Sequence, residues 1–112
     1  MEKMRILVAN EPCTYREVIA DAFRELRPHT EVSAVEPDSL EREVERLRPH
    51  LVVCSRLTAA VQSLLAWVVL YPDGENRALI NIAGELVTLV DIEFGHLLSI
   101  LDDAEQLLWR SI

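Results

Sequence analysis

The sequence contains very little lysine, and its overall charge is strongly negative. One lysine, Lys3, stands among eleven basic residues, against nineteen acidic ones, and the formal net charge is −8. Binding to the phosphates of a nucleic acid requires a basic face, so this composition argues against direct nucleic-acid binding by the domain. The arginines of residues 42–48 alternate with glutamates and are better interpreted as one solvated helix face of mixed charge.

Cysteine, glycine and long apolar runs are also scarce. Two cysteines, Cys13 and Cys54, are too few for a disulfide framework and indicate reduced thiols in the cytoplasm. Only three glycines occur, and none follows the first expected strand, which argues against a dinucleotide site or a phosphate-binding loop. No apolar stretch approaches the ~18 residues of a membrane span, and the N-terminal stretch does not resemble a secretory signal.

Strand and helix patterns alternate along the first two thirds of the chain, which we interpret as a single domain over residues 1–112. Short apolar runs predict strands at 5–9, 31–35, 51–54 and 66–71. Apolar residues at helical spacing predict helices between Thr14 and Pro28, between Pro37 and Pro49, and over 57–65. Two capping boxes, Thr14 with Glu17 and Asp38 with Glu41, are expected to begin the first two helices. This alternation predicts a parallel sheet of strand order 2-1-3-4, with helices on both faces.

The pattern changes after residue 71. Residues 72–76 form a turn too short for a helix, so the expected strand 78–83 should run antiparallel to 66–71. A second turn, Ala83-Gly84, leads to an expected strand at 86–90 and to a final helix over about 92–109, capped by Asp91 or a nearby acid. The predicted fold is a three-layer α/β sandwich in which an antiparallel hairpin and a last helix follow the parallel strands.

Two segments of the chain carry a family pattern. VANEPCTYREVIADAF gives a strand, an acidic turn and a helix without a gap, and RPHLVVCS gives a proline, a buried strand and a polar end. In these features residues 5–71 resemble the receiver domain of two-component response regulators. The resemblance implies that the family's acidic pair falls on Asn10 and Glu11. Its phosphoacceptor then falls on Ser55, and its Ser/Thr falls on or beside Tyr71. The family's lysine has no counterpart, and its fourth helix is missing.

These departures affect one chemical step. The family phosphorylates an aspartate with the help of magnesium, an ion that prefers carboxylate and phosphate oxygens. With Asn10 and Ser55 at two acidic positions, only Glu11 remains, and a serine hydroxyl is a weak nucleophile without an adjacent base. The resemblance therefore implies a bacterial pseudo-receiver that is no enzyme and needs no metal or cofactor. Its expected role is phosphorylation-independent signal transduction or transcriptional regulation.

The missing helix predicts an interaction surface. One sheet face near 66–71 and 78–83 is expected to lack its usual cover, and an exposed apolar patch usually marks an interface. The expected interface residues are Trp67, Val69, Ile80, Ile82, Leu86, Leu89 and Trp109. The expected partner is a second copy of the chain or a regulatory protein, and no membrane is expected to bind. The strand at 86–90 or the final helix is the alternative cover for this face.

A second interpretation is a small ligand-binding or redox-sensing domain. Ligand sites in open α/β sheets form at the carboxyl edge of the strands. Cys13, Cys54 and Ser55 are expected at this edge, and Arg56 is available for an anionic ligand. Chain spacing does not decide whether the cysteines lie within the ~7 Å that a disulfide needs, so paired and free thiols both stay open.

Overall fold

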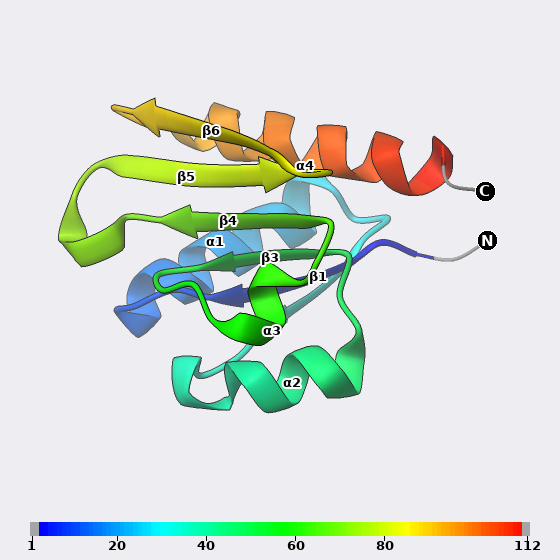
Figure 1. The fold of residues 1–112 in the computed structure, drawn as a ribbon, viewed down its shortest axis with the longest axis horizontal. Helices are drawn as coiled ribbons and strands as arrows, with labels where there is room; N and C mark the ends of the chain where they lie inside the picture. The colour runs from blue at the N-terminus through cyan, green and yellow to red at the C-terminus, as the bar shows by residue number, and fades with distance from the viewer. Residues whose placement is uncertain (1–2, 111–112) are drawn as a thin grey trace.

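A computed structural model describes residues 3–110 as a mixed α/β domain with one six-stranded sheet (Figure 1). The strands are β1 (Arg5–Ala9), β2 (Glu31–Ala34), β3 (Leu51–Cys54), β4 (Ala66–Leu70), β5 (Arg77–Ile82) and β6 (Glu85–Val90). The α-helices are α1 (Cys13–Leu26), α2 (Leu40–Leu47), α3 (Ala59–Gln62) and α4 (Phe94–Arg110). The sheet order is β2-β1-β3-β4-β5-β6, parallel as far as β4 and antiparallel from β4 to β6. The predicted 2-1-3-4 order and the antiparallel hairpin are both confirmed.

Helices cover both faces of the sheet, because successive strand residues point to opposite sides. Ile6 and Val8 of β1 join the core beneath α1 and α4, whereas Leu7 and Ala9 join the core beneath α2 and α3. Figure 1 shows α2 and α3 on one side of the sheet and α1 and α4 on the other. β3 and β4 are buried along their whole length, as expected for central parallel strands enclosed by helices.

The two predicted capping boxes were wrong. α1 begins one residue before Thr14, and Pro12 occupies the cap position without a side-chain bond. The Pro12 carbonyl accepts the first hydrogen bonds of the helix, from the Tyr15 and Arg16 N–H groups, so the helix begins ahead of the threonine. α2 is preceded by a single turn of 3-10 helix, Pro37–Ser39, again without a side-chain cap bond. Glu41 instead accepts a hydrogen bond from the Ala60 N–H at 3.1 Å and so connects α2 to the start of α3.

The sheet face that was expected to lack a helix is covered. The connection between β4 and β5 holds only one turn of 3-10 helix, Pro72–Gly74, in agreement with the predicted turn. α4 returns across the sheet and buries Leu97 and Leu101 in the same core cluster as α1. Arg27 fixes this arrangement, because its Nε and Nη2 atoms each donate to a carboxylate oxygen of Asp102 at 2.8 Å.

Three of the predicted interface residues are therefore buried, and their assignment was wrong. Trp67 and Val69 lie in the core beneath α2 and α3, and Ile80 lies in the core beneath α4. Their side chains alternate between two covered faces of β4 and β5, so neither strand presents an apolar patch of its own. The remaining predicted residues form a different group at the hairpin and the last helix. Ile82, Leu89 and Trp109 are half-buried, and Leu86 is exposed.

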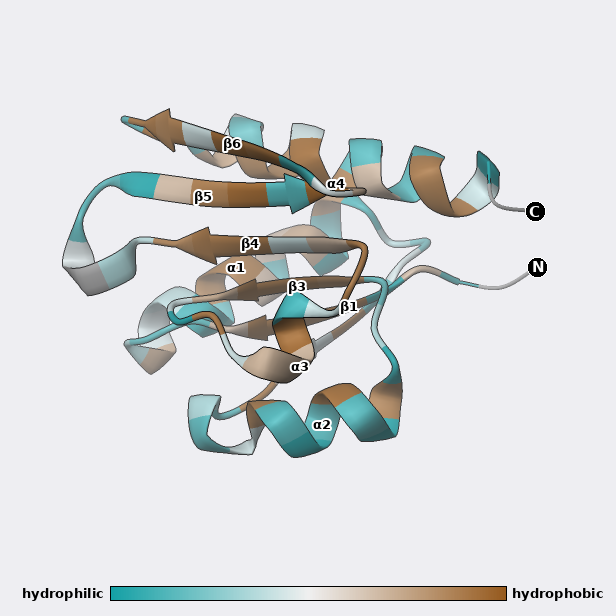
Figure 2. Cartoon of the chain, viewed as in Figure 1, coloured by the Kyte–Doolittle hydropathy of each residue, from teal (hydrophilic) through white to brown (hydrophobic). Residues whose placement is uncertain are grey.

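Hydropathy follows this layering (Figure 2). Apolar residues run along the strands, including β5 and β6, whereas α2 has a polar outer face. None of the helices within residues 3–110 has the length and apolar character needed to cross a bilayer.

Candidate functional site

The carboxyl edge of the sheet brings together the polar residues that follow β1 and β3. The Asn10 side-chain amide donates to Ser55 Oγ at 3.3 Å and to the Leu70 carbonyl at 3.0 Å. The Glu11 backbone N–H donates to the same Ser55 oxygen at 2.8 Å. Parallel neighbours end at the same sheet edge, which is why residues so distant in sequence meet here. We call this group of Asn10, Ser55 and the Leu70 carbonyl the edge network.

Asn10 is the buried centre of the edge network. Its side chain is 0% exposed, and its Oδ1 atom has no hydrogen-bond partner within the described part of the chain. Both Asn10 donors point toward acceptors that the fold itself supplies, one a hydroxyl and one a backbone carbonyl. A carboxylate at this position would offer no donor and a protonated acid only one, so the two acceptors favour an amide.

Ser55 acts as an acceptor in this arrangement. Its oxygen receives hydrogen bonds from the Glu11 N–H and from the Asn10 amide, which engage both of its lone pairs. A nucleophilic serine needs a neighbouring base to take its proton, and the donors around Ser55 are N–H groups. The geometry therefore favours a structural serine that connects the ends of β1 and β3.

The charged groups at this edge point into solvent. Glu11 and Arg56 approach to 3.8 Å, and both side chains are more than half exposed. An ion pair of this kind contributes little to stability, so it does not hold the edge in place. Among residues 3–110, no group of three or more histidine, cysteine or acidic side chains is placed to hold a metal ion.

The two cysteines are free thiols in different environments. Cys13 is exposed at the first position of α1, whereas Cys54 is buried at the end of β3. The Cys54 thiol donates to the Val68 carbonyl with an Sγ–O distance of 3.6 Å. Burial raises the pKa of Cys54 to about 12, because the thiolate would lose its hydration. The reactive form of Cys54 is therefore scarce at neutral pH, which weighs against a sensor based on this thiol.

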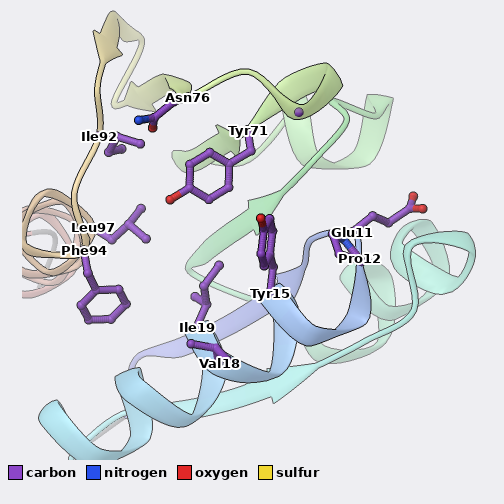
Figure 3. Close-up of a pocket in the computed structure, with 11 residues that line it drawn as sticks. Glu11, Pro12, Tyr15, Val18, Ile19, Tyr71, Asn76, Ile92, Phe94 and Leu97 are labelled. Carbon is purple, nitrogen blue, oxygen red and sulfur yellow. The ribbon is translucent and has the colours of Figure 1, made fainter.

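A groove beside the edge network was not predicted from the sequence. It has a volume of about 710 Å³ and lies between the start of α1, the β4–β5 connection and the start of α4 (Figure 3). The rings of Tyr15 and Tyr71 meet at one wall, with centroids 5.8 Å apart and planes tilted by 59°. The lining residues are Glu11, Pro12, Tyr15, Val18, Ile19, Tyr71, Gly74, Asn76, Ile92, Phe94 and Leu97.

The chemistry of this groove is mostly apolar. In Figure 3 the Tyr71 hydroxyl points across the groove toward Leu97, whereas the Glu11 carboxylate turns away from the groove. Tyr71 reaches this position from a left-handed backbone conformation, with φ of 56°. That conformation is uncommon for a residue other than glycine, and the sequence around Tyr71 gives no signal for it. Tyr15 and Val18 lie three positions apart on α1 and are exposed beside the groove, but their exposure is visible only in the structure.

Comparison with known proteins does not add a family to this description. No protein-family model matches the chain, and neither the curated proteins nor the solved structures gave a match. The class that the fold defines is a mixed α/β domain with a six-stranded sheet and helices on both faces.

Proposed function

We propose that the chain is a non-enzymatic, receiver-like module of signal transduction or transcriptional regulation that acts in the cytoplasm through contact with another protein. The single observation that supports this proposal most is the edge network. The Asn10 amide donates to Ser55 Oγ and to the Leu70 carbonyl at the sheet edge where the receiver resemblance would put phosphorylation chemistry. The parallel order β2-β1-β3-β4 is compatible with a flavodoxin- or receiver-like origin of the first four strands.

Phosphotransfer is the direct test of this proposal. The chain is incubated with acetyl phosphate and magnesium, and its intact mass is compared with that of an untreated sample. We expect no gain of a phosphoryl group, because Ser55 is engaged as an acceptor and Asn10 has replaced a carboxylate. A stable adduct that disappears in Ser55→Ala would contradict the proposal, and a known active receiver treated in parallel serves as the positive control.

A second candidate function is the binding of a small apolar ligand in the groove. Its volume of about 710 Å³ lies within the range of small-molecule sites, which are lined mainly by apolar and aromatic side chains with few polar groups. Val18 at its wall is 66% exposed, and Leu65 elsewhere on the surface is 63% exposed. The variants Val18→Glu and Leu65→Glu therefore form a matched pair. Binding of an apolar fluorescent dye should weaken in Val18→Glu alone, and equal weakening in both would reject the groove as the binding site.

A further inference from the structure

The last strand of the sheet, β6, has one neighbour and a bare outer edge. It pairs with β5 from Glu85 to Val90, and no strand or helix of residues 3–110 lies along its other edge. Leu86 is 62% exposed and Val90 is 69% exposed, and Thr88 between them is also exposed. Native proteins usually protect such an edge with charge, proline or a bulge. β6 carries a single charge, Glu85 at its first position, and no proline.

The backbone hydrogen bonds at the two ends of β6 establish which of its backbone groups are free. The hairpin pairs Ile82 with Glu85 across a two-residue turn, and the Asp91 N–H donates to the Asn76 carbonyl at 2.9 Å beyond the last strand pair. Hydrogen-bonded and non-bonded pairs alternate along an antiparallel ladder. Between these two pairs, the backbone N–H and C=O groups of Val87 and Leu89 therefore form the hydrogen bonds to β5. The N–H and C=O groups of the intervening Leu86, Thr88 and Val90 point outward.

The opposite edge of the sheet, at β2, is shorter and partly satisfied by a side chain. β2 is only four residues long, and its outward carbonyl at Val32 accepts a hydrogen bond from Arg24 Nη2 at 3.0 Å. Backbone bonds from Glu31 to Met4 and from Val35 to Val8 show that the odd-numbered residues of this segment face β1, so Val32 faces outward. One edge is short and occupied by an arginine, whereas the other is longer, apolar and unoccupied. This contrast makes β6 the edge that is available for pairing.

We infer that β6 pairs with β6 of a second copy of the chain, antiparallel across a two-fold axis at Thr88. This inference rests on the proposed function, since it names the surface and the partner of a module that acts by protein contact. In this register Leu86 lies opposite the partner's Val90, and Thr88 lies opposite the partner's Thr88. The outward N–H and C=O groups of all three residues then find partners. A two-fold axis at Val87 or Leu89 leaves one of the three residues unpaired within the strand.

The side chains on the α4 side fit the same register. Val87 lines a second cavity of about 290 Å³ between β5, β6 and α4, together with Ile82 and Ile100. Val87 lies opposite the partner's Leu89, so an apolar side chain from the partner is brought to the mouth of this cavity. Glu85 lies opposite the partner's Asp91 at each end, and this repulsion makes the dimer tighter at higher salt. A strand edge buries less area than a standard interface, so we expect dissociation in the micromolar range.

Charge substitution at the axis tests the register. Sedimentation equilibrium of the wild type from low to high micromolar concentration should show a monomer–dimer equilibrium. Thr88→Lys and Thr88→Glu should each be monomeric, because like charges face one another across the axis, and mixing the two variants should restore a dimer. The pair Gln62→Lys and Gln62→Glu, on exposed positions of α3, is the matched control and should dimerise as the wild type does.

A proline variant separates strand pairing from stacking of the sheet faces. The Thr88 N–H points outward, so Thr88→Pro keeps the bonds to β5 but removes a donor from the edge. This variant should be folded by circular dichroism and monomeric, whereas stacking through Leu86 and Val90 would leave it dimeric and overturn the inference. A wild type that stays monomeric at every concentration, or a dimer that persists in both Thr88 charge variants, also overturns it. Neither result bears on phosphotransfer, so the proposed function fails or survives separately.

Discussion

The edge network makes a quantitative prediction about Asn10. The substitution Asn10→Asp changes only an amide to a carboxyl group, at a side chain that is 0% exposed. It replaces the amide nitrogen that donates to the Leu70 carbonyl at 3.0 Å with an oxygen, which in the ionised form faces that carbonyl without a proton. The receiver resemblance makes this substitution informative, because an acid is the residue that a functional receiver site would carry here.

The size of the stability loss follows from the two states that are open to a buried carboxyl group. It either ionises without hydration or takes up a proton, and burial therefore raises the pKa of the introduced group above its unfolded value of about 3.9. Holding the proton at pH 7 costs about 1.4 kcal/mol for each of roughly three pH units, so the penalty at pH 7 reaches at most about 4 kcal/mol. At pH 5 the same reasoning gives about 1.5 kcal/mol. The folded state binds more protons than the unfolded state, so stability falls as pH rises.

Urea unfolding measures this effect at both pH values when it is monitored by tryptophan fluorescence, to which the buried Trp67 and the half-buried Trp109 contribute. The free energy of unfolding of Asn10→Asp is compared with that of the wild type at each pH. Asn10→Ala should lose stability equally at pH 5 and pH 7, and Glu11→Gln, which changes an exposed side chain, should lose almost none. If Asn10→Asp lowers the free energy of unfolding by less than about 1 kcal/mol and shows no pH dependence, the edge is a hydrated cleft that tolerates an acid. The edge network would then not be closed to water, and the reasoning would be wrong.

Three further predictions follow from burial and charge. A thiol reagent should modify Cys13 rapidly and Cys54 only on unfolding, because burial raises the Cys54 pKa to about 12; rapid reaction of both would contradict this. Leu101→Ala should destabilise by about 3 kcal/mol and Leu65→Ala by less than about 0.5 kcal/mol in urea unfolding; equal losses would contradict the core assignment. The hydrogen bond from Arg27 lowers the pKa of Asp102, so Asp102→Asn should melt at a lower temperature than the wild type at neutral pH, and this difference should disappear as the pH falls. A melting difference that stays the same at acidic pH would oppose this.

Periodicity predicted the elements and their pairing, because the fold depends mainly on which side chains are apolar. Residues 51–54 are apolar at every position and form a strand buried on both faces. The shortness of residues 72–76 predicted an antiparallel partner for β4, and β5 pairs in that direction. Helix starts were less predictable, since Pro12 and Thr14 both suit the first turn and only the local backbone decides between them.

Exposure of the hairpin was not predictable from local sequence. Trp67, Ile80 and Leu86 are all apolar and lie in neighbouring strands, yet the first two are buried and Leu86 is exposed. Their exposure differs because the two faces of the sheet are covered to different extents. α4 crosses back over one face, whereas α2 and α3 cover the other face only as far as β4 and part of β5. That arrangement depends on the path of the chain after residue 90, which the spacing of apolar residues within a strand does not encode. The groove at Tyr71 escaped prediction for a similar reason, since it depends on a left-handed residue.

The short connections after β4 explain why the free edge lies at β6. A parallel neighbour for β4 would need a crossover of a dozen or more residues, usually with a helix that covers the sheet next to it. The chain instead enters β5 after one turn of 3-10 helix and β6 after the two residues Ala83 and Gly84. Two strands are thus added to the sheet with only one helix, α4, to cover them. The face with Leu86 stays uncovered as a consequence, and β6, as the last strand of the sheet, keeps a free outer edge beside it. The short connections after β4 thus create the surface proposed for the second copy.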